Sequence, residues 1–460
     1  MWYLGIEFTM KHRPELDPGF LPLGPWMNAY EALAKKPVFV AVESAGGRMV
    51  TRKTAIIGDG KHDAADERYL ERLIKFLLWS VGGYRVLLCG ANEIAGRLRR
   101  AYAPGGERAF DAQFMEDVFE RAFTMITCED ACFPENRDAA VSVGGHTNGC
   151  RIGFDAGGSD RKVSAVRDGE CVYSEEVVWH PKTSADPQYH LSEIVKAFQT
   201  AAEKLPRVDA IGVSSAGVFV GNSPMVSSLF LKVPREQRAF LKDIYNAAAR
   251  RIGDGTVPIS VANDGDVTAL AGAMELKAGS VMGLAMGTSE AVGYVNEEGN
   301  ILGWFNELAF APVDLSESAM MDEWSGDIGV GCKYFSQDAV IKLAPAAGIT
   351  LSERLTPAEK LKEVQRLLEQ GWDAAASIYR TIGAYLGHTL ALYQKFYDIR
   401  FLLVLGRVVS GEGGRIILSA CSEVLQSEYP QIAERVKVIL PDEQSRRIGQ
   451  SVAAASLPVV

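Results

Sequence analysis

The sequence predicts an α/β protein with more than one globular unit. Its 460 residues exceed one typical domain, and strand-like and helix-like runs alternate after residue 150, a pattern that favours α/β units. We expect strands at 151–175, a helix at 190–204, a strand at 209–225, a helix at 236–251, a strand and helix at 258–277, two strands at 281–296, helices at 356–370 and 372–396, and a strand at 401–405.

The first part of the chain predicts a small α/β unit of its own. The expected elements are strands at 37–43, 49–57 and 85–89 and helices at 65–81 and 111–126. Gly46-Gly47 is typical of a hairpin turn between the first two strands. A polar, glycine-rich stretch at 134–150 suits a domain junction, so we assign residues 1–148 to an N-terminal extension of unknown role.

Composition and charge exclude several function classes. Apolar residues make up 47% of the chain, and no uncharged apolar run approaches the roughly 18 residues of a membrane span. The N-terminus lacks the features of a secretory signal, so we expect a cytoplasmic protein with no membrane partner. The net charge of -10 argues against nucleic acid, because binding to its backbone relies on clustered Lys and Arg.

The cysteines form no recognisable framework. Seven are scattered along the chain, in neither a disulfide nor a zinc pattern, and we expect reduced, mostly buried thiols. Cys128 and Cys132 have a spacing that places both on one face of a helix.

Residues 151–166 predict a phosphate-binding turn. Asp155 ends a strand, and Gly157, Gly158 and Ser159 precede a returning strand. Glycines let backbone N–H groups approach phosphate oxygens, and the neighbouring Asp can hold Mg²⁺ directly or through water. A plain β-hairpin explains this segment equally well when it is taken alone.

Three later segments carry related signals. Gly287, Thr288 and Ser289 form a second glycine-hydroxyl turn between strands, and the two turns together can clasp a polyphosphate. Asn263-Asp264 stands where a strand becomes a helix, a position that favours an ionised Asp as general base but also suits an ordinary helix cap. The glycine turn that begins at Gly406 can lie against a planar ring.

The order and spacing of these four pieces resemble the ROK family of repressors, open reading frames and kinases, within the actin-like ATPase superfamily. The resemblance implies two ribonuclease-H-like lobes, 149–270 and 271–460, around a cleft for ATP and Mg²⁺. It implies an ATP-dependent kinase that phosphorylates a hydroxyl of a hexose or hexose derivative, with Asp264 as base and a small sugar as partner. Family precedent also suggests a homodimer.

The resemblance further implies which residues bind each ligand. Asp155 helps to position Mg²⁺, while Asn263 and Glu307 bind the sugar. The implied residues for ATP with its metal are Asp155, Gly157, Gly158, Ser159, Lys162, Gly287, Thr288, Ser289, Gly406, Ser410 and Gly411.

The chain departs from the family at its zinc site. Members carry a His three residues after the sugar-binding Glu and a Cys-rich loop; here these are Phe310 and a loop that keeps only Cys332. Tyr334 stands where a second sugar-binding Glu is common. One thiol cannot build a closed four-ligand zinc site, so we predict no zinc and leave the identity of the sugar open.

Two other functions stay open at this point. Many family members are repressors with a DNA-binding helix-turn-helix ahead of the sugar module, and residues 91–100 could pass for a recognition helix. Against this, the extension has β-runs and its basic residues are diluted by acidic ones. A sugar or nucleotide sensor without turnover is the other alternative, although Asp264 argues for catalysis.

Overall fold

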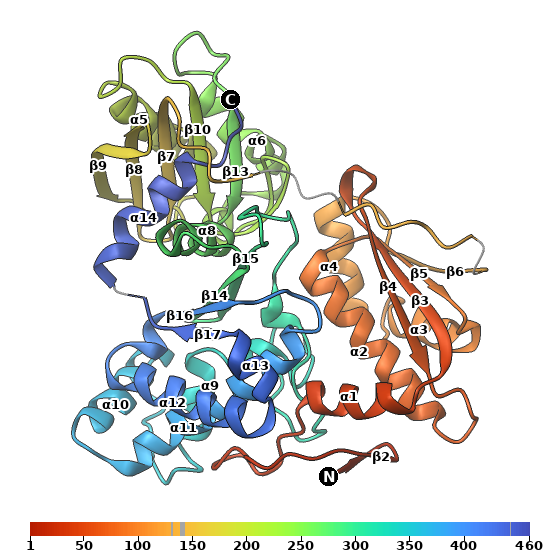
Figure 1. Ribbon diagram of the computed structural model, residues 1–460. Coiled ribbons are helices and arrows are strands. Elements are labelled where there is room, and N and C mark those ends of the chain that lie inside the picture. The colour runs from red at the N-terminus through yellow and green to blue at the C-terminus, as the bar shows by residue number, and fades with distance from the viewer. Residues whose placement is uncertain (130–131, 139–142, 442) are drawn as a thin grey trace.

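The computed structural model describes residues 1–129, 132–138, 143–441 and 443–460, the side chains of 443–448 excepted. Two α/β lobes are stacked one above the other, and the N-terminal extension lies beside them (Figure 1). No helix within the described ranges has both the length and the apolar character that a membrane crossing requires.

The N-terminal lobe is built on a five-stranded sheet in the order β13-β10-β7-β8-β9. β7, β8 and β9 pair antiparallel, whereas β10 and β13 continue from β7 in parallel. An apolar core forms between this sheet and its helices. The elements are β7 (Cys150–Ala156), β8 (Asp160–Arg167), β9 (Glu170–Val178), α5 (Pro187–Ala202), β10 (Ala210–Ser215), β11 (Val218–Val220), β12 (Ser223–Val226), α6 (Arg238–Lys242), α7 (Ile244–Ala249) and β13 (Ile259–Asn263).

The C-terminal lobe repeats this connectivity with one antiparallel strand fewer, in a sheet of order β15-β14-β16-β17. β14 and β15 pair antiparallel, and β16 and β17 continue in parallel from the other edge of β14. The shared pattern confirms the predicted fold of two ribonuclease-H-like lobes with an α/β extension. The elements are α8 (Asp264–Leu276), β14 (Val281–Met286), β15 (Glu290–Val295), α9 (Gln337–Leu343), α10 (Pro357–Glu369), α11 (Asp373–Tyr393), β16 (Phe401–Leu405), α12 (Glu412–Glu428), α13 (Pro430–Arg435) and β17 (Lys437–Ile439).

The last helix, α14 (Glu443–Ala455), lies against the N-terminal lobe (Figure 1). Ser451 and Ser164 of β8 share a hydrogen bond of 2.6 Å between their hydroxyls, and Arg151 of β7 donates to the carbonyl of Pro458 at 2.8 Å. The sequence assigned residues 271–460 to the C-terminal lobe, but the chain returns to the first lobe at its end.

The extension contains a four-stranded sheet in the order β4-β3-β5-β6, and its apolar core is continuous with that of the C-terminal lobe. Its helix α1 packs on α11, and α4 lies beside β11 and β12 of the other lobe, so the extension touches both lobes. The elements are β1 (Trp2–Tyr3), β2 (Ile6–Glu7), α1 (Leu23–Leu33), β3 (Lys36–Glu43), β4 (Met49–Ile56), α2 (Asp63–Val81), β5 (Arg85–Cys89), α3 (Asn92–Ala101), α4 (Ala109–Phe119) and β6 (Thr124–Cys128).

The helix predicted over 111–126 is wrong in its second half. α4 ends at Phe119 because Glu120 adopts a left-handed conformation with φ 51°, which an α-helix cannot continue through. The chain then enters β6, so Cys128 lies on a strand and shares no helix face with Cys132.

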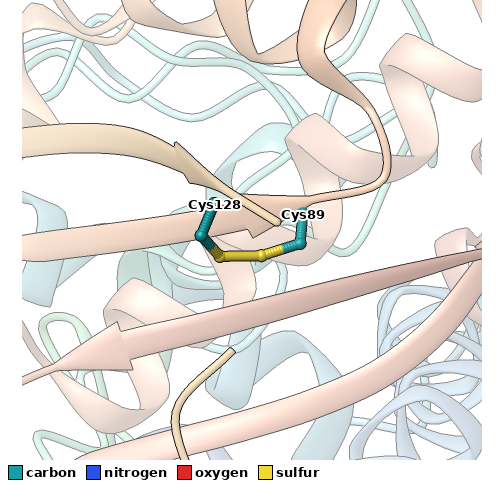
Figure 2. The surroundings of a disulfide bond; sticks show 2 residues. All are labelled: Cys89 and Cys128. Carbon is teal, nitrogen blue, oxygen red and sulfur yellow. A yellow bond between two sulfur atoms is a disulfide. The ribbon is translucent and has the colours of Figure 1, made fainter. Parts of the chain in front are cut away.

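The prediction that all cysteines are reduced thiols is also wrong for one pair. Cys89 and Cys128, paired residues on the neighbouring strands β5 and β6, form a disulfide (Figure 2). Their Cα atoms are 5.1 Å apart, within the usual range for such a bond. The five other cysteines are free, and Cys150, Cys332 and Cys421 among them are buried.

This pairing predicts a thiol count. Protein unfolded without reductant should take up five equivalents of an alkylating reagent, since two of its seven cysteines are bonded to each other. Prior reduction should raise the count to seven, as measured by intact-mass spectrometry. Seven equivalents without reductant would contradict the disulfide.

Candidate active site

The first glycine turn places Asp155 at the end of the central strand β7. Asp155 is buried and accepts a 2.9 Å hydrogen bond from the hydroxyl of Ser214 on β10. Burial raises the pKa of the Asp155 carboxyl to about 6; the Ser214 hydrogen bond opposes the rise, and the charge of Asp264 adds to it. Lys162 is the partner of Asp155 across the β7–β8 pair, and its ammonium lies 3.8 Å from the Asp160 carboxylate.

Gly157, Gly158 and Ser159 connect β7 to β8, and the adjacent Trp179 fixes the turn. Its indole N–H donates to the carbonyl of Gly157 at 2.7 Å, and its backbone N–H donates to the carbonyl of Ser159 at 3.2 Å. The backbone N–H groups of Gly157, Gly158 and Ser159 are thereby held in one conformation.

Lys182 lies over this turn and was missed in the sequence. A Cβ added to Gly158 would come within 2.7 Å of the Lys182 ammonium nitrogen, so the end of that side chain lies directly against the turn. Lys182 is exposed to solvent, and its charge lowers the pKa of Asp264. It belongs to an irregular loop after β9, where no periodic pattern marks it.

Asp264 is the first residue of α8 and faces both positive and negative groups. Burial raises the pKa of its carboxyl, while the backbone N–H of Gly265 and the charge of Lys182 oppose that rise. The side chain of Asn263 caps the helix by accepting from Gly265 N–H at 2.7 Å, and it donates to the carbonyl of Gly217 at 2.8 Å. An amide retains a second N–H and a second lone pair for a ligand.

The second glycine turn and the Gly406 turn are joined by a hydrogen bond. Gly287, Thr288 and Ser289 link β14 to β15, and the guanidinium of Arg407 donates to the Thr288 hydroxyl at 3.0 Å. Gly406 has φ 96° and lies against the backbone of Met286, with Ser410 and Gly411 following before α12. One hydrogen-bonded surface therefore contains both segments.

The two halves of the site meet where α8 crosses β15. A Cβ on Gly293 of β15 would lie 2.0 Å from the carbonyl oxygen of Gly265, so the two backbones touch and position 293 has no room for a side chain. Because β15 leaves the second turn and α8 begins at Asp264, this contact places Asp264 beside the strand that follows the Gly287–Ser289 turn.

Glu307 is held in place by the extension. The backbone N–H groups of Asn306 and Glu307 donate to the carbonyls of Ser80 and Trp79 at 3.0 Å each. These carbonyls lie in the last turn of α2, where helix carbonyls lack partners of their own. Burial raises the pKa of Glu307 to about 7, with the charges of Asp264 and Asp266 adding to it.

Two further carboxyls surround Glu307, and sequence reasoning missed both. Asp266 accepts from Tyr294 N–H at 3.1 Å and from the Asn306 amide at 2.8 Å, and burial raises its pKa to about 7. Glu290, which follows Ser289 directly, accepts from Tyr393 and has a pKa raised by burial to about 8, with Glu307 contributing. Three buried carboxyls with raised pKa values therefore lie on this side of the site.

Known proteins resemble the chain in fold rather than in sequence. No protein-family model matches the sequence, and no curated protein matches it. A ROK family transcriptional regulator, a homolog of the E. coli MLC protein, superposes with a TM-score of 0.52 at 16% identity, over 67% of this chain and 78% of its own. A ROK hexokinase from Thermus thermophilus superposes with a TM-score of 0.51 at 17% identity, over 66% of this chain and 97% of its own. The protein has the ROK fold.

An aromatic cluster surrounds Phe310, which stands where the family resemblance implies a zinc-binding His. Phe310 is buried against Trp79, Phe110 and Trp324, with ring centroids 4.6, 5.8 and 5.2 Å away. Tyr334 is buried too and donates to Asp314 at 2.6 Å. No group of three His, Cys, Asp or Glu able to hold a metal occurs within the described part of the chain.

The loop that carries Cys332 is tied to the extension by buried charges. Asp327 contacts Arg108 at 2.6 Å, Lys75 at 3.1 Å and Arg72 at 3.6 Å, all from α2 or the residue preceding α4. Burial alone would raise the pKa of Asp327, but the three cations hold it below its ordinary value. The cations of the extension therefore contact the loop that carries Cys332.

Proposed function

We propose that the protein is an ATP-dependent sugar kinase in which Asp264 accepts the proton of the acceptor hydroxyl. The supporting observation is that the charge of Asp264 reaches two groups of side chains. Its charge raises the pKa of Asp155, which lies beside the first glycine turn. It also raises the pKa of Glu307, which lies in the segment that resembles the family's sugar-binding segment. A carboxylate between a phosphate site and a hydroxyl site is what in-line phosphoryl transfer requires.

Each segment then has a role in the reaction. The backbone N–H groups of the two glycine turns bind phosphate oxygens, Lys182 adds positive charge over the first turn, and the Gly406 turn borders the adenine. Asp264 takes the proton as the acceptor oxygen bonds to the γ-phosphorus and the bond to the ADP oxygen breaks. Its raised pKa brings it nearer to neutral pH, where a general base works best.

Asp155 fits a Mg²⁺ ion bound together with phosphate oxygens. Only one of its oxygens accepts the Ser214 hydrogen bond, and Mg²⁺ usually takes one or two carboxylates together with substrate phosphates. Bound Mg²⁺ would neutralise charge on the phosphates. Asp155 and the phosphates would supply the ligands, and Asp264 would stay free to act as base.

A coupled ADP-release assay tests this function. We would supply ATP and Mg²⁺ with hexoses, amino sugars and acyl-amino sugars in turn. Release of ADP that depends on one of these sugars supports the kinase. Release that is the same with and without sugar, or none with any of them, contradicts it.

A DNA-binding regulator is the alternative, since one regulator shares the fold. The segment that resembled a recognition helix forms α3, which buries Ile94, Ala95 and Leu98 and follows a strand of the extension sheet. Two of its arginines are engaged, Arg97 with Glu67 and Arg99 with the carbonyl of Met125. These contacts favour a structural role for α3.

The raised pKa of Asp155 predicts how activity depends on pH. Its carboxyl binds Mg²⁺ only when ionised, so kcat/KM should be constant above about pH 7 and fall in acid below its pKa of about 6. The expected slope is about tenfold per pH unit. If Asp155 and the general base Asp264 both had ordinary pKa values, full activity would persist to near pH 4, and that profile would contradict the assignment.

A further inference from the structure

A pocket of about 690 Å³ lies where the extension meets both lobes. Its walls come from 44–48 and Arg137 of the extension, 217–222 and 260–263 of the N-terminal lobe, and 301–305 of the C-terminal lobe. Its size is that of a small-molecule site.

The pocket adjoins the proposed acceptor site. Asn263 lines it and precedes Asp264, while Phe305 lines it and leads directly into Asn306 and Glu307. A sugar whose hydroxyl faces Asp264 would therefore have one side open towards the pocket.

Its charges are unbalanced. The guanidinium of Arg48 donates to the carbonyls of Leu302 and Gly303 at 3.0 and 2.6 Å. It also donates to the Ser44 hydroxyl and the Val81 carbonyl at 3.3 Å each, which leaves its buried Nε–H without a hydrogen-bond partner among the described residues. Arg137 is exposed, and its side chain makes no hydrogen bond or ion pair within the described ranges.

The acidic groups beside the pocket offset the charge of Arg48 only in part: the charge of Asp138 raises the pKa of Arg48, but burial lowers it more, and the pKa lies below its ordinary value. Asp138 accepts from the indole of Trp304 at 3.1 Å, and Asp266 accepts from Tyr294 and Asn306. Neither forms an ion pair with Arg48 or Arg137 in the described structure. The rest of the wall is largely apolar, with Phe119 and Phe305 stacked at 5.3 Å.

We infer that the acceptor is an acidic sugar whose carboxylate-bearing substituent occupies this pocket beside Arg137 and Arg48. The inference rests on the proposed kinase function for the orientation of the sugar. Guanidinium groups bind carboxylates through charge-assisted hydrogen bonds, and apolar walls suit the carbon atoms of an ether or acyl group. A neutral sugar would leave Arg137 without a counterion among the described residues.

Calorimetric binding without nucleotide tests this inference through matched pairs of sugars. N-acetylmuramate and N-acetylglucosamine differ by a carboxylated ether, and glucuronate and glucose differ by a carboxylate. We expect the acidic member of at least one pair to bind about tenfold or more tightly than its neutral partner, as charged hydrogen bonds usually allow. Equal or weaker binding of both acids, or no binding of any of the four, overturns the inference.

The variant Arg137→Gln tests the role of the pocket and should fold, because that side chain is exposed. It should remove most of the preference for the acidic sugar. Arg354→Gln, which changes an exposed arginine far along the chain between α9 and α10, should leave the preference intact. A preference that Arg137→Gln does not reduce would overturn the assignment of the pocket.

Binding measured without ATP separates this inference from the proposed function. If acidic sugars bind through Arg137 but no sugar is phosphorylated, only the kinase fails. If neutral sugars are phosphorylated and acidic ones neither bind nor react, only the acidic acceptor fails.

Discussion

Asp264→Asn is expected to lower kcat for phosphoryl transfer by about 10²–10⁴, the usual contribution of a general base. The amide keeps the size of the side chain and can still accept from the N–H of Gly265, so the helix should form as before. KM for ATP should change little, because the nucleotide is held mainly by the glycine turns. Steady-state kinetics with saturating acceptor measure both quantities.

Asp254→Asn is the matched control for that variant. Asp254 is exposed and accepts hydrogen bonds from the backbone N–H and the hydroxyl of Thr256 in the loop before β13. It should keep the wild-type kcat. If Asp264→Asn also kept it, Asp264 would not be the base, and a sensor without turnover or a different base would have to be considered.

The second large effect is expected from Lys75→Met. Lys75 is fully buried and contacts Asp111 at 2.8 Å and Asp327 at 3.1 Å. Removing one partner of a buried ion pair leaves a carboxylate uncompensated and typically costs about 3–5 kcal/mol. We expect a loss of that size in the free energy of unfolding, measured with urea, and a higher KM for the acceptor because α2 also holds Glu307.

The pH dependence of this stability has a definite sign. The pKa of Asp327 is lowered in the folded protein, so its ion pairs contribute fully above the ordinary pKa of an Asp and are lost only as acid protonates it. Arg380→Gln, which removes half-exposed pairs with Glu15 and Asp373, should cost under about 1 kcal/mol. Equal losses in the two variants would contradict a special role for the buried charges.

Local patterns were sufficient to predict the fold. The alternation of strands and helices after residue 150 corresponds to the two sheets, and the order of the glycine turns pointed to the ROK fold that the solved structures share. The roles of Asp155, Asp264 and the glycine turns stay predictions, although the structure brings Asp155 and Asp264 close enough for their charges to interact.

Features that depend on distant contacts could not be predicted. α14 lies on the N-terminal lobe, and Cys89 meets Cys128 only because β5 and β6 are neighbours in a sheet. Glu120 ends α4 with a left-handed turn although it is not glycine, so no residue type marked the boundary. The largest omission is the extension, which appeared to be a separate unit yet holds the backbone of Glu307.

Identifying the product tests the central claim most directly. ATP, Mg²⁺ and the best-binding sugar would be incubated with the protein, and sugar phosphate, ADP and inorganic phosphate would be measured together by phosphorus NMR. A kinase gives one sugar phosphate for each ADP and almost no inorganic phosphate. ADP accompanied by an equal amount of inorganic phosphate, with no phosphorylated sugar, would contradict it.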